Sequence, residues 1–412
     1  MKQTEIGLIP DDWEVKSLGE IGEPCMCKRI LKEQTSPTGD IPFYKIGTFG
    51  GIPDAYISRE LFEQYKEQYN YPKKGTLLLS AAGTIGRVVV FDGKDSYFQD
   101  SNIVWIDNDE TKVTNDFLFY CYSRMQWKTE EGGIVSRLYN ANLKSTSFIA
   151  PKSLAEQERI AKALSDVDAL ISTTEKLIQK KKNIKQGAMQ NLLTGKKRLP
   201  GFGDKQTDLF VPNGTHTKEV KDVSPEQIRL SAKMKQTELG EIPEDWEVKS
   251  LGEMLKIGHG KDYKNLKSGN VPVYGTGGYM TSVNGFLYEG ETVCIGRKGT
   301  IDKPQYHSGK IWTVDTLFYT YDFKSLNPKY LFYKFCLIDW LSMNEASGVP
   351  SLTAKNIEDI QITIPTEEEQ TAIANVLSSM DKEIETLNTK LEKYRNLKTA
   401  MMQQLLTGKI RL

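Results

Sequence analysis

The side chains in this sequence that are best suited to binding chemistry are basic, hydroxyl and amide groups near glycine-rich or turn segments. Arginine and lysine can neutralise phosphates, and tyrosine, serine and asparagine can hydrogen-bond the edges of bases. In the first half of the chain we single out Tyr44, Lys45, Lys74, Arg87, Arg137, Tyr139 and Asn142. In the second half we single out Tyr274, Arg297, Lys298, Lys303, Ser351 and Lys355. For each of them, a solvated surface charge or a core tyrosine is an equally good interpretation.

The most suggestive of these segments is Gly296–Gly299, which places a basic pair in a flexible turn. The run Lys180–Lys182 is best interpreted as a solvated face, although Lys181 occupies an apolar-stripe position and could mark a helix crossing or a phosphate contact. Trp13 and Trp246 are better interpreted as core anchors than as base-stacking groups.

The patterns of several common catalytic and cofactor sites are missing. The three histidines, His216, His259 and His307, have no metal-ligand spacing with one another or with a cysteine. Cys25 and Cys27 have no downstream partner pair, so zinc is not expected. Gly195 is followed by lysine, but Gln190 and Lys197 stand where a phosphate loop requires glycine and Ser or Thr. A self-contained nuclease or methyltransferase is therefore the least supported interpretation.

Length and composition set broad limits. A chain of 412 residues is expected to form two to four domains. The net charge of zero argues against a bulk polyanion binder but leaves a local basic face open. No apolar window is long enough for a transmembrane helix, and the first residues show no secretory signal. Five scattered cysteines suit reduced thiols, so we expect a cytoplasmic protein without a membrane partner.

The elements that must position these residues are arranged as one unit that occurs twice. Met1–Glu20 and Met234–Glu253 are identical at 17 of 20 positions, and Leu192–Leu199 and Leu405–Leu412 at seven of eight. Between these ends the copies diverge strongly. Drift after a recent duplication would scatter changes evenly, so we favour a division of labour between two unlike middles in a common frame.

Each middle is predicted to be a mixed α/β domain. Short β-rich runs lie between Gly, Asp and Asn turns, at Thr76–Leu79, Val88–Phe91, Ile103–Ile106, Thr292–Ile295 and Leu317–Thr320. A short helix is predicted over Asp116–Met125, with a counterpart over Lys329–Leu341.

After each middle, apolar residues recur at alternating steps of four and three, which is typical of a coiled coil. We expect packing between helices from Ile160, Leu164, Val167, Ile171 and Ile178 in the first copy. The second copy supplies Ile373, Leu377, Met380, Ile384, Leu387 and Leu391. Ser153 with Glu156, and Thr366 with Glu369, predict capping boxes. Each helix is expected to run for about 41 residues, or roughly 60 Å.

Two equal stripes in one chain predict antiparallel pairing within the chain, which we favour over homodimerisation. The predicted fold class is α+β, with two mixed α/β domains separated by two long antiparallel coiled-coil helices in a pseudo-two-fold internal repeat. The expected divisions are a first domain with its frame segment over 1–152, a helix over 153–199, a linker over 200–233, a second domain over 234–365 and a helix over 366–412.

The frame resembles a known family. The opening pattern G-x-I-P-x-x-W-x-V-x-x-L-G-E, present at Gly7–Glu20 and Gly240–Glu253, is similar to the start of the specificity subunit of type I restriction-modification systems. Pro365–Ala374 and Ala155–Ala161 resemble the family's helix start, and the L-L-T-G-K-x-R-L helix ends are also similar. The resemblance covers essentially the whole chain, twice.

The resemblance implies two target recognition domains, each reading one half of a bipartite double-stranded DNA site. It also implies that the helices fix the spacing of the half-sites and dock two methyltransferase subunits, and that cleavage needs the separate restriction subunits, which are also the motor. On this reading the chain is not catalytic and binds no cofactor itself, because S-adenosylmethionine and ATP with magnesium belong to the partners. The alternative is a coiled-coil scaffold that carries two protein-binding domains.

Overall fold

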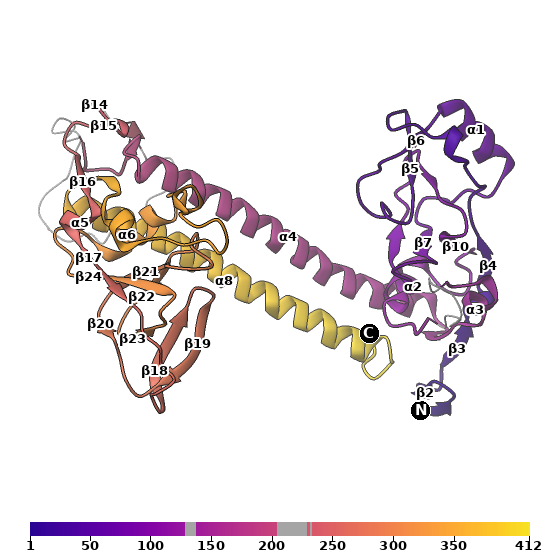
Figure 1. Ribbon diagram of the computed structural model, residues 1–412. Coiled ribbons are helices and arrows are strands. Elements are labelled where there is room, and N and C mark those ends of the chain that lie inside the picture. Colours follow the sequence, from indigo (N-terminus) through magenta and orange to yellow (C-terminus); the bar gives the residue numbers. More distant parts are fainter. Residues whose placement is uncertain (128–136, 204–228, 231–232) are drawn as a thin grey trace, which may run out of the picture. The chain divides into compact units, whose positions relative to one another are not determined.

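A computed structural model describes residues 1–127, 137–203, 229–230 and 233–412, with the backbone alone at 229–230 (Figure 1). These residues divide into two compact units, Met1–Thr174 with Lys390–Leu412, and Glu175–Thr389. Each unit therefore contains one globular domain together with part of each long helix. Most of the linker predicted over 200–233 lies outside the described residues.

An antiparallel four-stranded sheet is central to the first unit. Its strand order is β4 (Gly22–Cys25), β10 (Ile103–Asn108), β7 (Leu77–Ser80) and β8 (Val88–Val90). A second sheet has the order β6 (Tyr56–Ile57), β5 (Ile41–Tyr44) and β9 (Tyr97–Phe98), in which β5 and β9 are parallel.

The second unit repeats this plan. Its four-stranded antiparallel sheet has the order β17 (Lys256–His259), β24 (Leu317–Tyr321), β21 (Thr292–Gly296) and β22 (Gln305–His307). Its second sheet has the order β19 (Gly278–Val283), β18 (Ser268–Gly275), β23 (Lys310–Thr313) and β20 (Tyr288–Glu289), and β18 and β23 are again parallel. The duplicated architecture therefore survives where the sequences have diverged.

The repeated opening forms the same frame in both units. It begins with a hairpin, β1 (Lys2–Thr4) and β2 (Gly7–Ile9) in one copy, β14 (Met234–Thr237) and β15 (Gly240–Pro243) in the other. The next strand, β3 (Trp13–Ser17) or β16 (Glu247–Ser250), pairs with the strand leading into the long helix, β11 (Ser147–Pro151) or β25 (Gln361–Ile364). A further pair joins β12 (Lys197–Arg198) to β13 (Arg229–Leu230).

Short helices complete each domain. They are α1 (Arg59–Gln68), α2 (Asn115–Tyr122) and α3 (Asn140–Ser145) in the first unit, and α5 (Leu251–Met254), α6 (Pro328–Phe335) and α7 (Ala354–Glu358) in the second. The predicted helices over Asp116–Met125 and Lys329–Leu341 correspond to α2 and α6, which are shorter. Trp13 and Trp246 are fully buried in the cores of their units.

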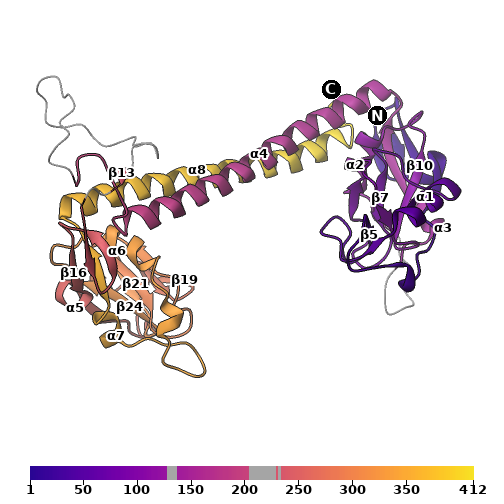
Figure 2. The ribbon, with the colours of Figure 1, turned by 90° about the horizontal axis from the view of Figure 1, so that it is seen from above.

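The long helices α4 (Leu154–Leu192) and α8 (Glu367–Leu405) have 39 residues each. In each unit they lie side by side and run in opposite directions, as the views in Figures 1 and 2 agree. Lys181 contacts Glu383 and Lys185 contacts Asp381, so residue numbers rise along α4 in the direction in which they fall along α8, as in an antiparallel pair. Gly195, beyond the end of α4, has a positive φ of 72° that favours glycine after a helix.

The apolar stripe faces the partner helix and the domains, but two helices alone cannot cover it completely. Its members nearest the domains are buried, namely Ile160, Leu164, Val167, Ile373 and Leu377. Ile178 and Leu391 are also buried. Half-buried positions are Ile171, Met380, Ile384 and Leu387.

Two sequence predictions about the helices need correction. The backbone N–H of Glu156 does meet the Ser153 hydroxyl at 3.4 Å, but the Glu156 carboxylate binds Arg411 instead of completing the capping box. Glu369 likewise binds Arg198, because a buried arginine gives a carboxylate two charge-assisted hydrogen bonds, whereas a backbone N–H gives it one neutral bond. Of the two roles considered for Lys181, the structure shows the helix crossing, since its ammonium lies 2.7 Å from Glu383.

The described part of the chain contains no helix with the length and apolar character needed to cross a bilayer. All five cysteines are free thiols. Over the same described ranges, no three His, Cys, Asp or Glu side chains gather as a metal site would require.

Candidate nucleic-acid interface

The same glycine-led turn follows the third strand of the central sheet in both units. It is Gly83–Ile85 after β7 and Gly299–Ile301 after β21, and the first glycine has a φ of 65° in one and 95° in the other. An isolated backbone bridge holds Arg137 beside the first turn, and another joins Lys298 to Ser351 beside the second. The structure therefore brings three of the predicted binding residues to equivalent places in the two domains.

Arg137 also lines a pocket of about 640 Å³ in the first domain. Three further cations line it, namely Arg29, Lys32 and Lys45. The Lys45 ammonium lies 2.8 Å from the Asp54 carboxylate, whereas Lys32 and Arg137 have no carboxylate partner in the described part of the chain. An excess of cations around a polar hollow suits phosphate groups.

The other predicted residues of the first domain lie elsewhere. Tyr44 stacks on Phe98 with ring centroids 5.8 Å apart and packs against the buried core. The Arg87 guanidinium donates a hydrogen bond to the carbonyl of Phe49 at 3.0 Å. Lys74 and Tyr139 are exposed, and Asn142 is half-buried.

In the second domain, the basic pair Arg297 and Lys298 is exposed at the turn after β21. Arg297 donates from Nη1 to the Asp315 carbonyl at 3.1 Å, which holds its side chain close to its own loop. Lys355 lies on α7, and its ammonium is 2.6 Å from the carboxylate of Asp359 directly after that helix. Lys298 is therefore the cation of this group with the greatest freedom to meet an anion.

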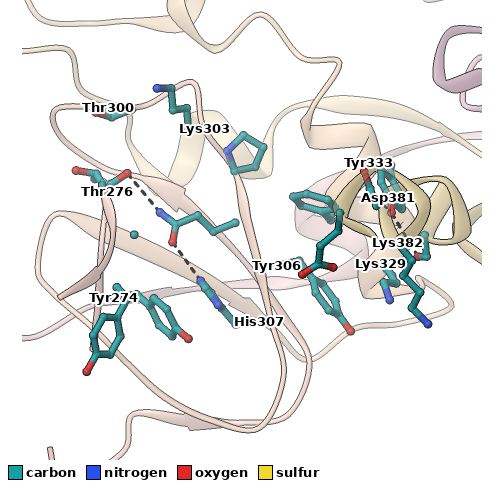
Figure 3. Close-up of a pocket in the computed structure, with 18 residues that line it drawn as sticks. Tyr274, Thr276, Thr300, Lys303, Tyr306, His307, Lys329, Tyr333, Asp381 and Lys382 are labelled. Atoms are coloured by element: carbon teal, nitrogen blue, oxygen red, sulfur yellow. Dashed lines mark hydrogen bonds between the residues drawn. The ribbon is translucent and has the colours of Figure 1, made fainter. Parts of the chain in front are cut away.

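A second pocket of about 640 Å³ opens between the second domain and helix α8 (Figure 3). The predicted residues Tyr274 and Lys303 line it. Two lysines that sequence reasoning missed, Lys329 and Lys382, also line it. Asp381 and Glu385 also line the pocket, but none of these three lysines has a carboxylate within salt-bridge distance among the described residues, so each can meet an anionic ligand.

An aromatic wall of this pocket is held rigidly. The His307 ring stacks on Tyr274 with centroids 3.7 Å apart, and its Nε2 lies 3.1 Å from Oε1 of Gln305. Burial lowers the pKa of His307 to about 4, so the ring is neutral at pH 7. Because Gln305 Oε1 can only accept, Nε2 carries the proton. Figure 3 shows this chain of bonds continuing from Gln305 to the backbone at Thr276, 3.3 Å away.

A buried arginine clasp closes the frame of the second unit. Arg198, from the end of α4, donates to both oxygens of Asp245 at 2.7 and 2.9 Å and to both oxygens of Glu369 at 2.9 and 2.5 Å. Trp246 Nε1 donates to the same Glu369 carboxylate at 3.1 Å. Burial alone would raise the pKa of Asp245, but its bonds to Arg198 outweigh this effect and lower it.

The first unit has the equivalent clasp, made by Arg411 from the end of α8. Its guanidinium binds the Asp12 oxygens at 2.9 and 2.6 Å and also both oxygens of Glu156. The Arg411 hydrogen bonds lower the pKa of Asp12. Nε1 of Trp13 is buried without a hydrogen-bond partner in the described structure, which is the main difference between the clasps. Each frame is therefore closed by the helix that begins in the other repeat.

The clasp residues were visible in the sequence only as positions that are kept in both copies. Arg198 and Arg411 are the arginine of the repeated helix end, and Asp12 and Asp245 precede the repeated tryptophan. The pocket cations had no such signal, because Arg29, Lys32 and Lys329 lie in the divergent middles and Lys382 on α8 corresponds to Ala169 in the first copy.

Comparison with known proteins gives one family. The family model described as type I restriction modification DNA specificity domain matches residues 10–185 and 243–393. A Haemophilus influenzae protein, named provisionally as a type I restriction enzyme specificity subunit, is 59% identical over 160 residues, which is 39% of this chain and 41% of that protein. The Methanocaldococcus jannaschii type I restriction enzyme MjaVIII specificity subunit is 25% identical over 98% of this chain and 94% of its own length.

The fold is also similar to a solved structure. The S subunit of a type I restriction-modification system from M. genitalium has a TM-score of 0.61, is 15% identical and is covered over 98% of both chains. At this identity the likeness shows the fold alone. Since the family model matches both repeats and covers well over half of the residues, the chain belongs to the type I restriction modification DNA specificity family.

Proposed function

We propose that this chain is the DNA-recognition subunit of a type I restriction-modification complex, in which each domain reads one half of a bipartite site. The observation that carries the proposal is the contrast between a repeated frame and unlike reading surfaces. The clasps use the same residue types in both units, whereas Arg137 stands at the first turn where Ser351 and Lys298 stand at the second. Two different half-sites read from one scaffold require this contrast.

The chemistry of the candidate surfaces supports the proposal. Cations beside turns suit phosphates, which give affinity, and hydroxyl and amide groups suit base edges, which give specificity. In the first domain we assign these roles to the pocket around Arg137 and Lys45. In the second domain we assign them to the turn at Lys298 and the pocket around Tyr274 and Lys303.

We assign the spacing of the half-sites to the antiparallel helices α4 and α8. Both are 39 residues long and their pairing is closed by a clasp in each unit. Two readers on one rigid support bind tightly only when both half-sites lie at the matching distance.

We assign the binding of two methyltransferase subunits to the repeated frame. Its hairpins expose apolar side chains at the same place, with Ile6 and Leu239 each 46% exposed. An apolar exposed position that recurs in both copies favours one partner bound twice. In this proposal the chain is cytoplasmic and not catalytic, and S-adenosylmethionine, ATP and magnesium act on the methyltransferase and restriction subunits.

The test is to purify the chain with its cognate methyltransferase subunit and map the methylated positions on genomic DNA. A bipartite, asymmetric site is expected, and the chain alone should transfer no methyl group. Replacing Lys256–Ile364 by the corresponding segment of a relative should change one half-site and leave the other intact. A change in both halves, or in neither, would refute the modular reading, and an absence of salt-dependent binding to duplex DNA would favour a protein-binding scaffold.

A further inference from the structure

A tyrosine, an aspartate and a lysine join three helices of the first unit, and we name this contact the strut. Tyr120 lies on α2, Asp168 on α4 and Lys398 on α8. The Tyr120 hydroxyl donates to Asp168 Oδ2 at 3.0 Å, and the Lys398 ammonium lies 2.6 Å from Asp168 Oδ1. The same ammonium lies 5.7 Å from the centre of the Tyr120 ring. One carboxylate therefore connects the domain to both long helices.

The second unit contains the same strut, formed by Tyr333 on α6, Asp381 on α8 and Lys185 on α4. The Tyr333 hydroxyl donates to Asp381 Oδ2 at 2.7 Å, a bond drawn in Figure 3. The Lys185 ammonium lies 2.5 Å from Asp381 Oδ1 and 5.3 Å from the Tyr333 ring centre. The two struts therefore agree in residue types, in the atoms that meet and in the helices that carry them.

The strut residues occupy corresponding positions in the two copies. A constant offset of 213 positions separates Tyr120 from Tyr333, Asp168 from Asp381 and Lys185 from Lys398. Directly after the tyrosine, the first copy has a cysteine and the second a lysine. In each strut the tyrosine and aspartate come from one repeat and the lysine from the other, so the contact ties the two copies together.

The position of the struts on the helices matters for geometry. In the first unit the apolar core of the domain reaches Leu164 on α4, and Asp168 follows four residues later. In the second unit the buried part of the core reaches Leu377 on α8, and Asp381 follows four residues later. Four residues correspond to about 6 Å along a helix. The core and the clasp attach the domain near the helix ends, and the strut adds an attachment one turn further along the helix.

The protonation states suit this role. Burial raises the pKa of Tyr120, and the bonded aspartate raises it further, so the hydroxyl remains a donor at neutral pH. Burial raises the pKa of Tyr333 in the same way. Asp168 and Lys398 are 34% and 29% exposed, so they are ion-paired at the edge of solvent without being fully desolvated.

We propose that these two struts are positioning contacts that fix the angle of each reading domain against the helix pair, and that they thereby determine how sharply the protein distinguishes DNA spacer lengths. The inference rests on the proposed function. Contacts confined to the helix ends would allow a domain to tilt about them, whereas an attachment further along the helices resists that tilt.

The scale of DNA shows why a small pivot matters. One added base pair moves a half-site by about 3.4 Å and turns it by roughly 35°, because one helical turn of 10–10.5 base pairs spans about 34–36 Å. A domain that could shift by one turn of protein helix, about 5.4 Å, would cover more than one base pair of spacer. Discrimination of single base pairs therefore requires a contact that resists such a shift.

The test uses the complex with the cognate methyltransferase subunit. Methylation is measured on DNA molecules whose half-sites are separated by the preferred spacer or by one base pair more or less. The double variant Tyr120→Phe with Tyr333→Phe removes only the two hydroxyl groups. We expect the ratio of methylation at the preferred spacer to that at the neighbouring spacers to fall at least about tenfold, because two hydrogen bonds to a carboxylate are lost and one such bond corresponds to about a factor of ten. The preferred bases of each half-site should not change.

Matched controls separate this effect from general loss of stability. Glu383→Gln removes an ion pair between α4 and α8 two residues from Asp381, and among the described residues no hydrogen bond or ion pair joins Glu383 to the domain. Asp166→Asn removes an exposed pair within α4 two residues from Asp168. Both controls should keep the wild-type ratio, whereas Asp381→Asn should lower it.

Three outcomes would overturn the inference. They are an unchanged ratio in the tyrosine variant, an equal fall in the Glu383→Gln control, or a changed base preference at equal folded fraction. If the wild-type complex methylates no bipartite site, the proposed function fails first. A wild-type complex with sharp spacing and an unaffected tyrosine variant would refute the struts alone.

Discussion

Replacing Arg198 by methionine should destabilise the second unit far more than replacing Arg411 destabilises the first. The Arg198 side chain is 6% exposed and its partner Glu369 is 0% exposed. Without the guanidinium, the indole N–H of Trp246 is the one side-chain donor that the described residues leave to the Glu369 carboxylate. A buried charge that loses its partner costs about 3–5 kcal/mol.

The Arg411 clasp is closer to water, because its side chain is 43% exposed. Glu156 is only 4% exposed, but Asp12 is 61% exposed and solvent can replace Arg411 there, so we expect a smaller loss of about 1–2 kcal/mol from Arg411→Met. The two variants change the same position of a repeated motif, which makes them a matched pair.

Hydrogen exchange measured by mass spectrometry can follow each clasp separately. Amides at the start of α8, over 367–377, report on the second unit, and amides at the start of α4, over 154–164, report on the first. The expected losses correspond to exchange that is roughly a hundredfold to a few thousandfold faster in Arg198→Met and about tenfold faster in Arg411→Met.

A second substitution tests the cause. Adding Glu369→Gln to Arg198→Met should restore part of the protection, because a neutral amide needs no counter-charge. Equal acceleration in the two single variants, or no recovery in the double variant, would refute the argument from an unpaired buried carboxylate.

Three further predictions concern backbone strain and pH. Gly408→Ala should lower the thermal midpoint by several degrees in calorimetry, because φ is 66° and a Cβ would lie 2.5 Å from Pro10. Its control is Gly187→Ala in α4, where a Cβ would meet open space, and this variant should raise the free energy of unfolding by up to about 1 kcal/mol. Burial lowers the pKa of Lys334 from 10.5 to about 7, so between pH 7 and 10.5 the unfolded chain binds more protons than the folded chain, and the free energy of unfolding should rise with pH. The urea midpoint of the wild type should therefore be higher at pH 9.5 than at pH 7, and Lys334→Met should remove this difference. The His307 pKa, lowered from 6.5 to about 4 by burial, makes stability fall as pH drops through this window, and NMR should find the ring neutral at pH 5.5; a titration near 6.5 would contradict this prediction.

Local patterns were sufficient to predict the long helices α4 and α8, the short helices α2 and α6, and the strands β7, β8, β10, β21 and β24. The four-and-three spacing that starts at Ile160 and Ile373 placed both long helices, which begin at Leu154 and Glu367. The run Ile103–Ile106 became β10 because a continuous apolar run between turns suits a central strand. These signals depend on neighbours in sequence.

The clasps and struts could not be predicted in the same way, because their partners are far apart in the chain. Glu156 lies three residues after Ser153, which is the ordinary spacing of a capping box, whereas its true partner Arg411 lies 255 residues away. The only sequence signal was that the same residue types recur in both copies. Comparing the copies position by position would have identified Tyr120 with Asp168 as a repeated pair.

The candidate surfaces were predicted in part. Lys45 and Arg137 share a pocket, as do Tyr274 and Lys303. Tyr44 was selected for its place near a glycine cluster, but the parallel pairing of β5 with β9 places its ring against Phe98. A pairing between strands that are more than 50 residues apart leaves no periodic trace in either segment.

The exchange of helix ends between the repeats also sets an order of events during synthesis. Arg198 is synthesised before Asp245, so the clasp arginine of the second unit is already present when the second domain is synthesised. Asp12 must wait for Arg411, which the ribosome adds 399 residues later, or roughly 20–80 s at bacterial rates of translation. The domain that is synthesised first is therefore completed last. During much of synthesis the first domain lacks its clasp, and in a chain truncated before Arg411 that clasp would not form.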